Sequence, residues 1–337
     1  MELAAVVVVP SKDGLMAAED FQSHAPETFE DSGAFCSSRV PILGNDVMRS
    51  WMERVRKLGV QNLWLTSGSD EKSLGSELSR LARQGIDRLL VIKLKSYAEM
   101  DLSDLFRFHC NSRNSITEAR DARGHLGISL LDRLALRAAE RKYESSEVRF
   151  AGGRPYHFNG YAKRILSAKE RQELVGDALI GACALRPSGK QIREQVWIGE
   201  GASLADSVRV IGPTYIGART IVRAGATIGP LASVERDCVV DCGTTVEQST
   251  VLPDTYLAPG LMIRRAMVDG AHLEDLRSGI VADLQPAGLG SRIEPAKSRK
   301  AESREALQDV FPRMDGTQDW GFAASSTASQ PWIQVRL

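Results

Sequence analysis

The sequence lacks several features that would assign it to a simple class of protein. Lysine plus arginine (43) equals aspartate plus glutamate (43), so the basic excess typical of nucleic-acid-binding proteins is missing. The five cysteines are an odd number without CxxC spacing, which argues against a disulfide framework and favours a reducing compartment. We therefore expect a cytoplasmic protein that binds no nucleic acid.

Long apolar runs are also missing. No segment approaches the ~20 apolar residues that a membrane-spanning helix needs. The short run Leu3–Val9 has no basic region before it and is followed by Pro10, so it reads as a buried first strand and not as a signal peptide. We expect no membrane association.

The clearest pattern that is present has a period of six residues. Aliphatic residues recur at every sixth position, at Ile198, Leu204, Val210, Ile216, Val222, Ile228, Val234, Val240, Val246 and Leu252. Four residues after each stands a small or β-branched residue, at Ala202, Val208, Thr214, Thr220, Ala226, Ala232, Cys238, Thr244 and Thr250, with Tyr256 as the exception. Helices repeat at 3.6 residues and ordinary strands at 2, so neither keeps step with this period.

A period of six is typical of a left-handed parallel β-helix, in which each triangular coil takes three hexapeptides. We predict this fold for residues 191–275, with the aliphatic residues inside and the small ones at the corners. After Leu252 the phase slips by one residue, which suggests a last irregular coil. Cys238 occupies a corner position and lacks nearby ligands, so we interpret it as a packing residue and expect no metal site.

The first 190 residues predict a different architecture. Strands and helices alternate at Leu3–Val9, 46–58, 62–66, 69–84, 88–94 and 101–109, a βαβ series that implies a parallel sheet with helices on both faces. Further strands are expected near 115–119, 127–131 and 148–150, and an amphipathic helix at 168–182 is expected to dock this domain onto the β-helix. Residues 10–38 have no sustained periodicity and predict a mobile loop.

The remaining residues, 276–337, predict a mostly disordered tail. Charges of both signs are dense after about residue 285, and the stretch 315–329 is rich in Gly, Ser, Ala and Thr. The alternative is a docking peptide, with anchors at Phe311, Trp320, Phe322 and Trp332.

Three stretches, residues 40–45, 101–109 and 197–202, resemble parts of the nucleotide-sugar pyrophosphorylases, in particular of the mannose-1-phosphate guanylyltransferases. Residues 40–45 (VPILGN) are similar to the segment that follows the first strand of that family, and 101–109 (DLSDLFRFH) to its D-L-x-x-L-x-x-x-H motif. Residues 197–202 (WIGEGA) resemble its β-helical coils. The resemblance implies a truncated nucleotidyltransferase-like α/β domain followed by the left-handed β-helix.

The catalytic motifs of that family do not carry over. Its Gly-rich G-x-G-x-R loop is replaced by residues 10–14 (PSKDG), where Lys12 is a weak catalytic candidate. Arg39 is the nearest cation to the position of the family's lysine, and Lys95 falls where its Mg²⁺-binding aspartate should stand. The second such aspartate aligns with Asn159. An ammonium repels the metal ion that nucleotidyl transfer uses to neutralise charge, so the resemblance implies a degenerate active site with no metal.

Positive charge elsewhere could still bind an anion. Lys93 and Lys95 stand at the end of a predicted strand, where α/β sheets place ligands. His157 has Arg154, Lys163 and Arg164 as neighbours, and with Tyr161 these residues form a second candidate site for a sugar phosphate. The alternative is that these residues form a solvated basic edge and that Lys95 pairs with Glu99.

The sequence therefore predicts a catalytically inactive, pyrophosphorylase-like protein with a regulatory or scaffolding role in nucleotide-sugar or polysaccharide metabolism. On this interpretation the protein binds no cofactor. Its expected ligand is a nucleotide or a sugar phosphate. Its expected protein partner is a second copy or a related nucleotidyltransferase subunit, bound through the β-helix. One alternative is an active, Mg²⁺-dependent sugar-1-phosphate nucleotidyltransferase. Another is a hexapeptide acyltransferase with His272 as general base.

Overall fold

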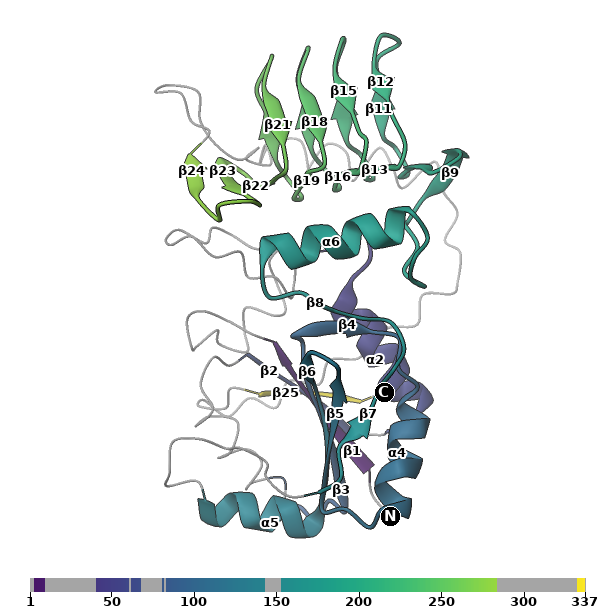
Figure 1. Ribbon diagram of the computed structural model, residues 1–337, viewed down its shortest axis with the longest axis vertical. Coiled ribbons are helices and arrows are strands. Elements are labelled where there is room, and N and C mark those ends of the chain that lie inside the picture. The colour runs from purple at the N-terminus through teal and green to yellow at the C-terminus, as the bar shows by residue number, and fades with distance from the viewer. Residues whose placement is uncertain are drawn as a thin grey trace, which may run out of the picture.

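The computed structural model describes residues 3–9, 41–60, 62–67, 81, 83–142, 153–283 and 332–336. In these ranges the protein is a mixed α/β molecule with two regions (Figure 1). We call the described residues between 3 and 164, together with 332–336, the sheet region, and residues 190–283 the stacked-strand region. Helix α6 (Ala168–Leu179) lies between them.

The sheet region is built on a mixed sheet. In spatial order its strands are β25 (Trp332–Arg336), β2 (Asn62–Ser67), β1 (Leu3–Val9), β3 (Arg88–Lys93), β6 (Gly124–Asp132), β5 (Ile116–Asp121) and β7 (Tyr156–His157). β1 is parallel to β2 and β3, as the βαβ pattern predicts. β6 is antiparallel to both β3 and β5. The prediction of a parallel sheet therefore holds for β1–β3 and is wrong for β6, which a two-residue turn joins to β5, whereas a parallel pair needs a long crossover.

Helices cover both faces of this sheet. α2 (Val47–Lys57) and α4 (Leu102–Asn111) pack on one face with Ala5 and Val7, whereas α5 (Arg133–Lys142) packs on the other with Ala4 and Val6. This division follows from the alternation of side chains along a strand. α2 and α4 confirm the helices predicted at 46–58 and 101–109. The predictions of a strand at 148–150 and of most of the helix at 69–84 lie outside the described residues.

A short ribbon connects the sheet region to α6. β4 (Ser96–Ala98) pairs antiparallel with β8 (Ala162–Arg164). The chain then enters α6 through a capping box, in which the Ser167 hydroxyl accepts from the Glu170 N–H and the Glu170 carboxylate accepts from the Ser167 N–H. The capping box explains why α6 begins immediately after Ser167.

The stacked-strand region consists of short strands in three sheets. The first has the order β24 (Val281–Asp283), β23 (His272–Asp275), β22 (Ala266–Asp269), β19 (Thr250–Val251), β16 (Ala232–Val234), β13 (Thr214–Ile216), β10 (Val196–Ile198) and β9 (Lys190–Arg193). The second has the order β11 (Ser203–Leu204), β14 (Ile221–Val222), β17 (Val239–Val240) and β20 (Tyr256–Leu257). The third has the order β12 (Arg209–Val210), β15 (Thr227–Ile228), β18 (Thr245–Glu247) and β21 (Met262–Arg264).

Most strands in these sheets pair in parallel at a fixed step along the chain. Ile198 pairs with Ile216 and Ile216 with Val234, a step of 18 residues. From there the step falls to 17, since Val234 pairs with Val251. Consequently Val251, and not Leu252, joins the buried aliphatic cluster inside the stack, while Leu252 packs outside it against α6. The six-residue period in the sequence therefore places its last member, Leu252, one residue too late.

The same shift accounts for the exception at Tyr256. The small residues of the pattern from Thr214 to Thr250 are buried, and after the shift the equivalent buried position is Thr255. Tyr256 is thereby moved to the outer surface of β20, where its hydroxyl donates to Asp241 at 2.8 Å. Cys238 is fully buried, and its thiol donates to the Leu252 carbonyl at 3.1 Å.

Two segments of the predicted tail form strands. Val281–Asp283 is β24, and Trp332–Arg336 is β25, which pairs antiparallel with β2 at the edge of the mixed sheet. The other predicted anchors, Phe311, Trp320 and Phe322, lie outside the described residues, as do the remaining residues from 284 to 331. Among the described helices, none has the length and apolar character needed to cross a membrane.

Candidate functional site

Lys95 and Lys93 lie at the carboxyl end of β3, as predicted. Lys95 is exposed, and its backbone N–H donates to the Lys93 carbonyl at 2.6 Å while its carbonyl accepts from Ile165 at 3.1 Å. Lys93 is half-buried as the last residue of β3. The other two weak catalytic candidates, Lys12 and Arg39, fall outside the described residues.

His125 lies beside these lysines at the start of β6. Its Nδ1 accepts from the Gly127 N–H at 2.8 Å, so Nε2 carries the proton and lies 3.2 Å from the Ser129 hydroxyl. Burial lowers the pKa of His125; the nearby Lys93 and Lys95 charges lower it further, and only Glu118 raises it. His125 is therefore a neutral imidazole next to the cationic end of β3.

Mg²⁺ requires oxygen ligands, usually carboxylates. The two positions aligned with the family's metal aspartates hold the Lys95 ammonium and the Asn159 amide. These residues do not fit the ion. Across the described part of the chain, no group of three or more His, Cys, Asp or Glu side chains is placed to hold a metal.

The second predicted anion site is not assembled as one cluster. Lys163 and Arg164 are consecutive in β8 and bind carboxylates of different elements. The Lys163 ammonium lies 3.1 Å from Asp177 of α6, and the Arg164 guanidinium lies 2.8 Å from Asp121 of β5. His157 is exposed on β7.

Tyr161 belongs to the same predicted anion site. Its hydroxyl donates to the Asp177 carboxylate at 2.6 Å. Burial raises the pKa of Tyr161, and the Asp177 charge raises it further. Burial alone would lower the pKa of Lys163, but Asp177 and Glu173 reverse this and raise it. Both side chains are thus protonated and held by carboxylates, and they tie β8 to α6.

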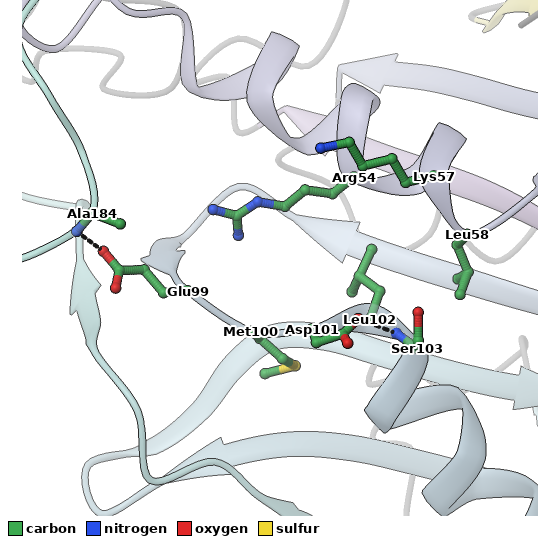
Figure 2. Close-up of a pocket in the computed structure, with 9 residues that line it drawn as sticks. All are labelled: Arg54, Lys57, Leu58, Glu99, Met100, Asp101, Leu102, Ser103 and Ala184. Carbon is green, nitrogen blue, oxygen red and sulfur yellow. Dashed lines mark hydrogen bonds between the residues drawn. The ribbon is translucent and has the colours of Figure 1, made fainter.

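A cavity of about 340 Å³ lies between α2, the start of α4 and the strand β4 (Figure 2). The lining residues are Arg54, Lys57, Leu58, Glu99, Met100, Asp101, Leu102, Ser103 and Ala184. None of them was a candidate site residue in the sequence. A local signal was available only in the helical spacing of the two cations, which places them on one face of α2.

The cavity has a cationic wall and an acidic wall. Arg54 lies 4.9 Å from the centre of the Trp51 ring and donates to the Ala98 carbonyl, so its guanidinium is fixed. Lys57, one turn later, is exposed at the cavity. Figure 2 shows both side chains extending from α2 on the side of the cavity opposite Asp101.

The two carboxylates of the acidic wall have partners within the protein. Glu99 accepts from the Tyr97 hydroxyl at 3.2 Å and from the Ala184 N–H. Asp101 caps α4 by accepting from the Ser103 N–H at 2.8 Å. Each carboxylate keeps further acceptor capacity. The arrangement can therefore bind a small ligand that carries both an anionic group and hydroxyl groups.

His272, the general base of the acyltransferase alternative, lies in β23. This strand is one arm of an antiparallel hairpin with β22, and His272 is exposed there.

Comparison with known proteins gives a weak and partial relationship. The chain is 27% identical over 118 residues to a UTP–glucose-1-phosphate uridylyltransferase of Synechocystis sp. (strain ATCC 27184 / PCC 6803 / Kazusa). The match covers 35% of this chain and spans 30% of that relative's length. No protein-family profile matches the chain. These comparisons support, at most, a distant relationship to the sugar-1-phosphate nucleotidyltransferases.

Proposed function

We propose that this chain is a nucleotide-sugar pyrophosphorylase-like protein that performs no nucleotidyl transfer and has a regulatory or scaffolding role in nucleotide-sugar and polysaccharide metabolism. The observation that carries the proposal is the similarity to a uridylyltransferase. The parallel pairing at 18-residue steps supports the accompanying proposal that the stacked strands form a left-handed β-helix. That β-helix would bind a second copy or a related nucleotidyltransferase subunit.

The lack of catalysis is proposed from the chemistry at the end of β3. Nucleotidyl transfer depends on cations that neutralise charge on the transferred phosphate and on carboxylates that hold the metal. Lys95 is exposed at the relevant edge, and Lys93 and Arg120 add positive charge around His125. Such an edge attracts phosphate, and within the described part of the chain no group of three or more His, Cys, Asp or Glu side chains is placed to hold a metal ion.

For the ligand, we propose a sugar phosphate in the cavity between α2 and α4. Arg54 and Lys57 would bind the phosphate, because charge-assisted hydrogen bonds to phosphate are the strongest available there. The acceptor oxygens of Glu99 and Asp101 on the opposite wall would bind hydroxyl groups. Lys57 is exposed and Arg54 is half-buried, so Lys57 is the simpler of the two cations to test.

The decisive experiment is incubation of the protein with glucose 1-phosphate, UTP and Mg²⁺, followed by measurement of pyrophosphate. We expect no release above the protein-free blank. Release would establish the alternative that the name of the similar protein favours, an active sugar-1-phosphate nucleotidyltransferase.

Calorimetry with glucose 1-phosphate tests the ligand separately. We expect binding that weakens about tenfold in Lys57→Ala, the effect of one charged contact of about 1.4 kcal/mol. Lys190→Ala is the matched control, because Lys190 is an exposed lysine of β9 outside the cavity. Equal affinity of the two variants would remove the cavity from the proposal.

A further inference from the structure

The second sheet of the stacked-strand region has an outer row of residues that is largely apolar. Its strands β11, β14, β17 and β20 pair in parallel, and the register aligns one outer residue of each strand. These residues are Ser203, Ile221, Val239 and Tyr256. In the last three strands the next residue, Val222, Val240 or Leu257, is buried inside the stack. Since side chains alternate along a strand, the row faces outward, and Ile221 is 44% exposed there.

This outer face lies away from the sheet region. α6 packs along the first sheet, where Gln172 donates to the Leu231 carbonyl at 3.1 Å and accepts from the Thr250 hydroxyl at 2.5 Å. Figure 1 shows α6 along the first sheet and β11 on the side of the stack that is away from α6. Another molecule can therefore approach the outer face without meeting the sheet region of the same chain.

Charged residues flank the row and give it a polarity along the stack. Arg219 and Arg223 stand two residues before and two residues after the central residue of β14, and Asp237 and Asp241 stand in the same places around β17. Arg219 pairs with Asp237 at 2.6 Å, and Arg223 with Asp241 at 3.2 Å. The two arginine side chains remain 61% and 54% exposed. The face is therefore cationic beside β14 and acidic beside β17.

The apolar row is self-complementary when two such faces meet with their stacks antiparallel. A two-fold axis between β14 and β17 then places β14 of one molecule against β17 of the other. Ile221 faces the partner's Val239, so that aliphatic groups meet near the axis. Tyr256 faces the partner's Ser203, so that the largest residue of the row meets the smallest.

The charges select the same orientation. With antiparallel stacks, Arg219 faces the partner's Asp237. In the same way, Arg223 faces the partner's Asp241. With parallel stacks, Arg219 would instead face the partner's Arg223, and like charges would oppose each other.

We propose that the outer face of the second sheet binds a second copy of this chain, with the two stacks antiparallel about a two-fold axis. The proposal rests on the scaffolding part of the proposed function and deepens it, because it selects one of the two protein partners and names the surface. A different subunit would need matching charges of its own, whereas a second copy already carries cations and carboxylates at the required positions.

The expected dimer is weak. The face consists of four short strands, less than the roughly 800 Å² per partner of a standard interface. The charges are already paired within each molecule, so they set the register more than they add affinity. The affinity comes from the apolar row. The Tyr256 hydroxyl already donates to Asp241 at 2.8 Å, so the ring can be buried with its polar atom satisfied.

The first test is the mass of the full chain, measured by sedimentation from about 1 to about 200 μM, a range that brackets the Kd of a weak interface. We expect the mass to rise from that of a monomer to that of a dimer. Ile221→Arg should weaken dimerisation at least about tenfold, because it opposes charge to an apolar residue at the axis. Thr227→Arg is the matched control, since Thr227 has the same outward position on β15 in the third sheet.

A monomeric wild-type protein over the whole range would overturn the proposal. Equal dimerisation of Ile221→Arg and Thr227→Arg would overturn it too, because the contact would then lie elsewhere. Neither result affects the pyrophosphate measurement, which tests the proposed absence of catalysis. Pyrophosphate release, in turn, would contradict the proposed function without changing the mass.

Charge exchange tests the orientation. Arg219→Asp and Asp237→Arg each place like charges opposite one another in an antiparallel homodimer, so each variant alone should dimerise more weakly than the wild-type protein. A mixture of the two variants restores opposite charges and should recover the dimer. If Arg219→Asp dimerised more tightly by itself, it would face the partner's Arg223, and the antiparallel arrangement would be wrong. Failure of the mixture to recover the dimer would also overturn the arrangement.

Discussion

The two regions of this molecule obtain their strand partners in different ways. In the stacked-strand region Ser203 pairs with Ile221, 18 residues later, and Ile221 pairs with Val239 at the same step. In the sheet region Leu3 pairs with Arg88, and Asn62 of β2 with Arg336 of β25. Where strands pair at a short, repeated separation along the chain, the stability of each strand depends mainly on its two neighbours. Where strands pair with residues far away in the sequence, the stability of each strand depends on the whole sheet.

The buried polar groups differ in the same way. In the stacked-strand region the Thr220 hydroxyl donates to the Glu235 carbonyl at 2.8 Å, and the Ala266 N–H donates to the Ser249 hydroxyl at 3.0 Å, each between residues 15 to 17 apart in the sequence. In the sheet region the Ser96 hydroxyl donates at 2.5 Å to the carbonyl of Leu126, which lies 30 residues later in the sequence. Periodic contacts add up along the stack, and the contacts of the sheet region form one cooperative unit.

The largest expected effects come from truncating one core residue in each region. Ile228→Ala and Leu90→Ala both remove a fully buried side chain and should each lower the free energy of unfolding by about 2–5 kcal/mol. In Ile228→Ala, faster amide exchange should be confined to β15 and its neighbours β12 and β18. In Leu90→Ala it should spread over the mixed sheet. If amide exchange became faster throughout the molecule in both variants, the two regions would not differ in the way proposed.

The second prediction concerns the tight turn between the regions, whose Gly44 N–H donates to Glu235 of the stacked-strand region at 2.9 Å. Gly44→Ala should destabilise the protein by about 1–3 kcal/mol more than Gly59→Ala, because the new Cβ meets the Ser188 and Tyr215 hydroxyls. Gly59 is the control, since it also has positive φ but nothing within 4 Å of an added Cβ. Thermal melts of the two variants give the difference. Equal melting temperatures would show that the turn accommodates the methyl group.

The third prediction uses pH to contrast the regions. Burial alone would raise the pKa of Asp121, but the Arg164 hydrogen bonds lower it below 3.8, so its contribution to stability is present above that pH and is lost as the pH falls further. Asp121→Asn should cost about 1–2 kcal/mol at pH 7 and nothing in strong acid, measured by urea unfolding. Glu235 of the stacked-strand region contrasts with Asp121, because burial raises the pKa of Glu235.

The smallest effect is expected at the surface of the stack. Arg219 pairs with Asp237 at 2.6 Å, but its side chain is 61% exposed. Arg219→Ala should therefore change stability by less than about 1 kcal/mol, and the difference should shrink in 1 M salt. A loss of several kcal/mol would show that this exposed ion pair contributes much more to stability than surface pairs usually do.

The extent to which each region could be predicted follows from its pairing. The spacing of Ile216, Val222 and Val234 predicted strands that the structure pairs in parallel. Because paired residues are separated by a short, constant number of residues, the tertiary contacts produce a period that is visible in the sequence. Helices α2 and α4 were predicted for a similar reason, since the helical spacing of apolar residues such as Val47, Trp51 and Val55 is a pattern within a short segment. A strand was predicted near 127–131, where β6 lies, but its antiparallel direction was not, because pairing with β3 is not a local property.

The candidate sites show more clearly what the sequence could not predict. The sequence placed Lys163 and Arg164 together as neighbours, but their partners come from α6 and β5 and lie on different elements. Arg54 and Glu99 meet at one cavity only after two elements pack. Each of these outcomes depends on which carboxylates and carbonyls reach a cation from distant parts of the chain.

By itself, the sequence determined the period of the stack, the order of strands and helices around β1–β3, and the identity of the cation at the end of β3. Tertiary structure alone decided the one-residue shift that buries Val251, the pairing of the cations, and the burial of Glu235 under the turn at Leu43 and Gly44. The physical reason is range. Propensity and periodicity act over a few residues, whereas burial and charge pairing are set by whichever groups the completed fold brings into contact.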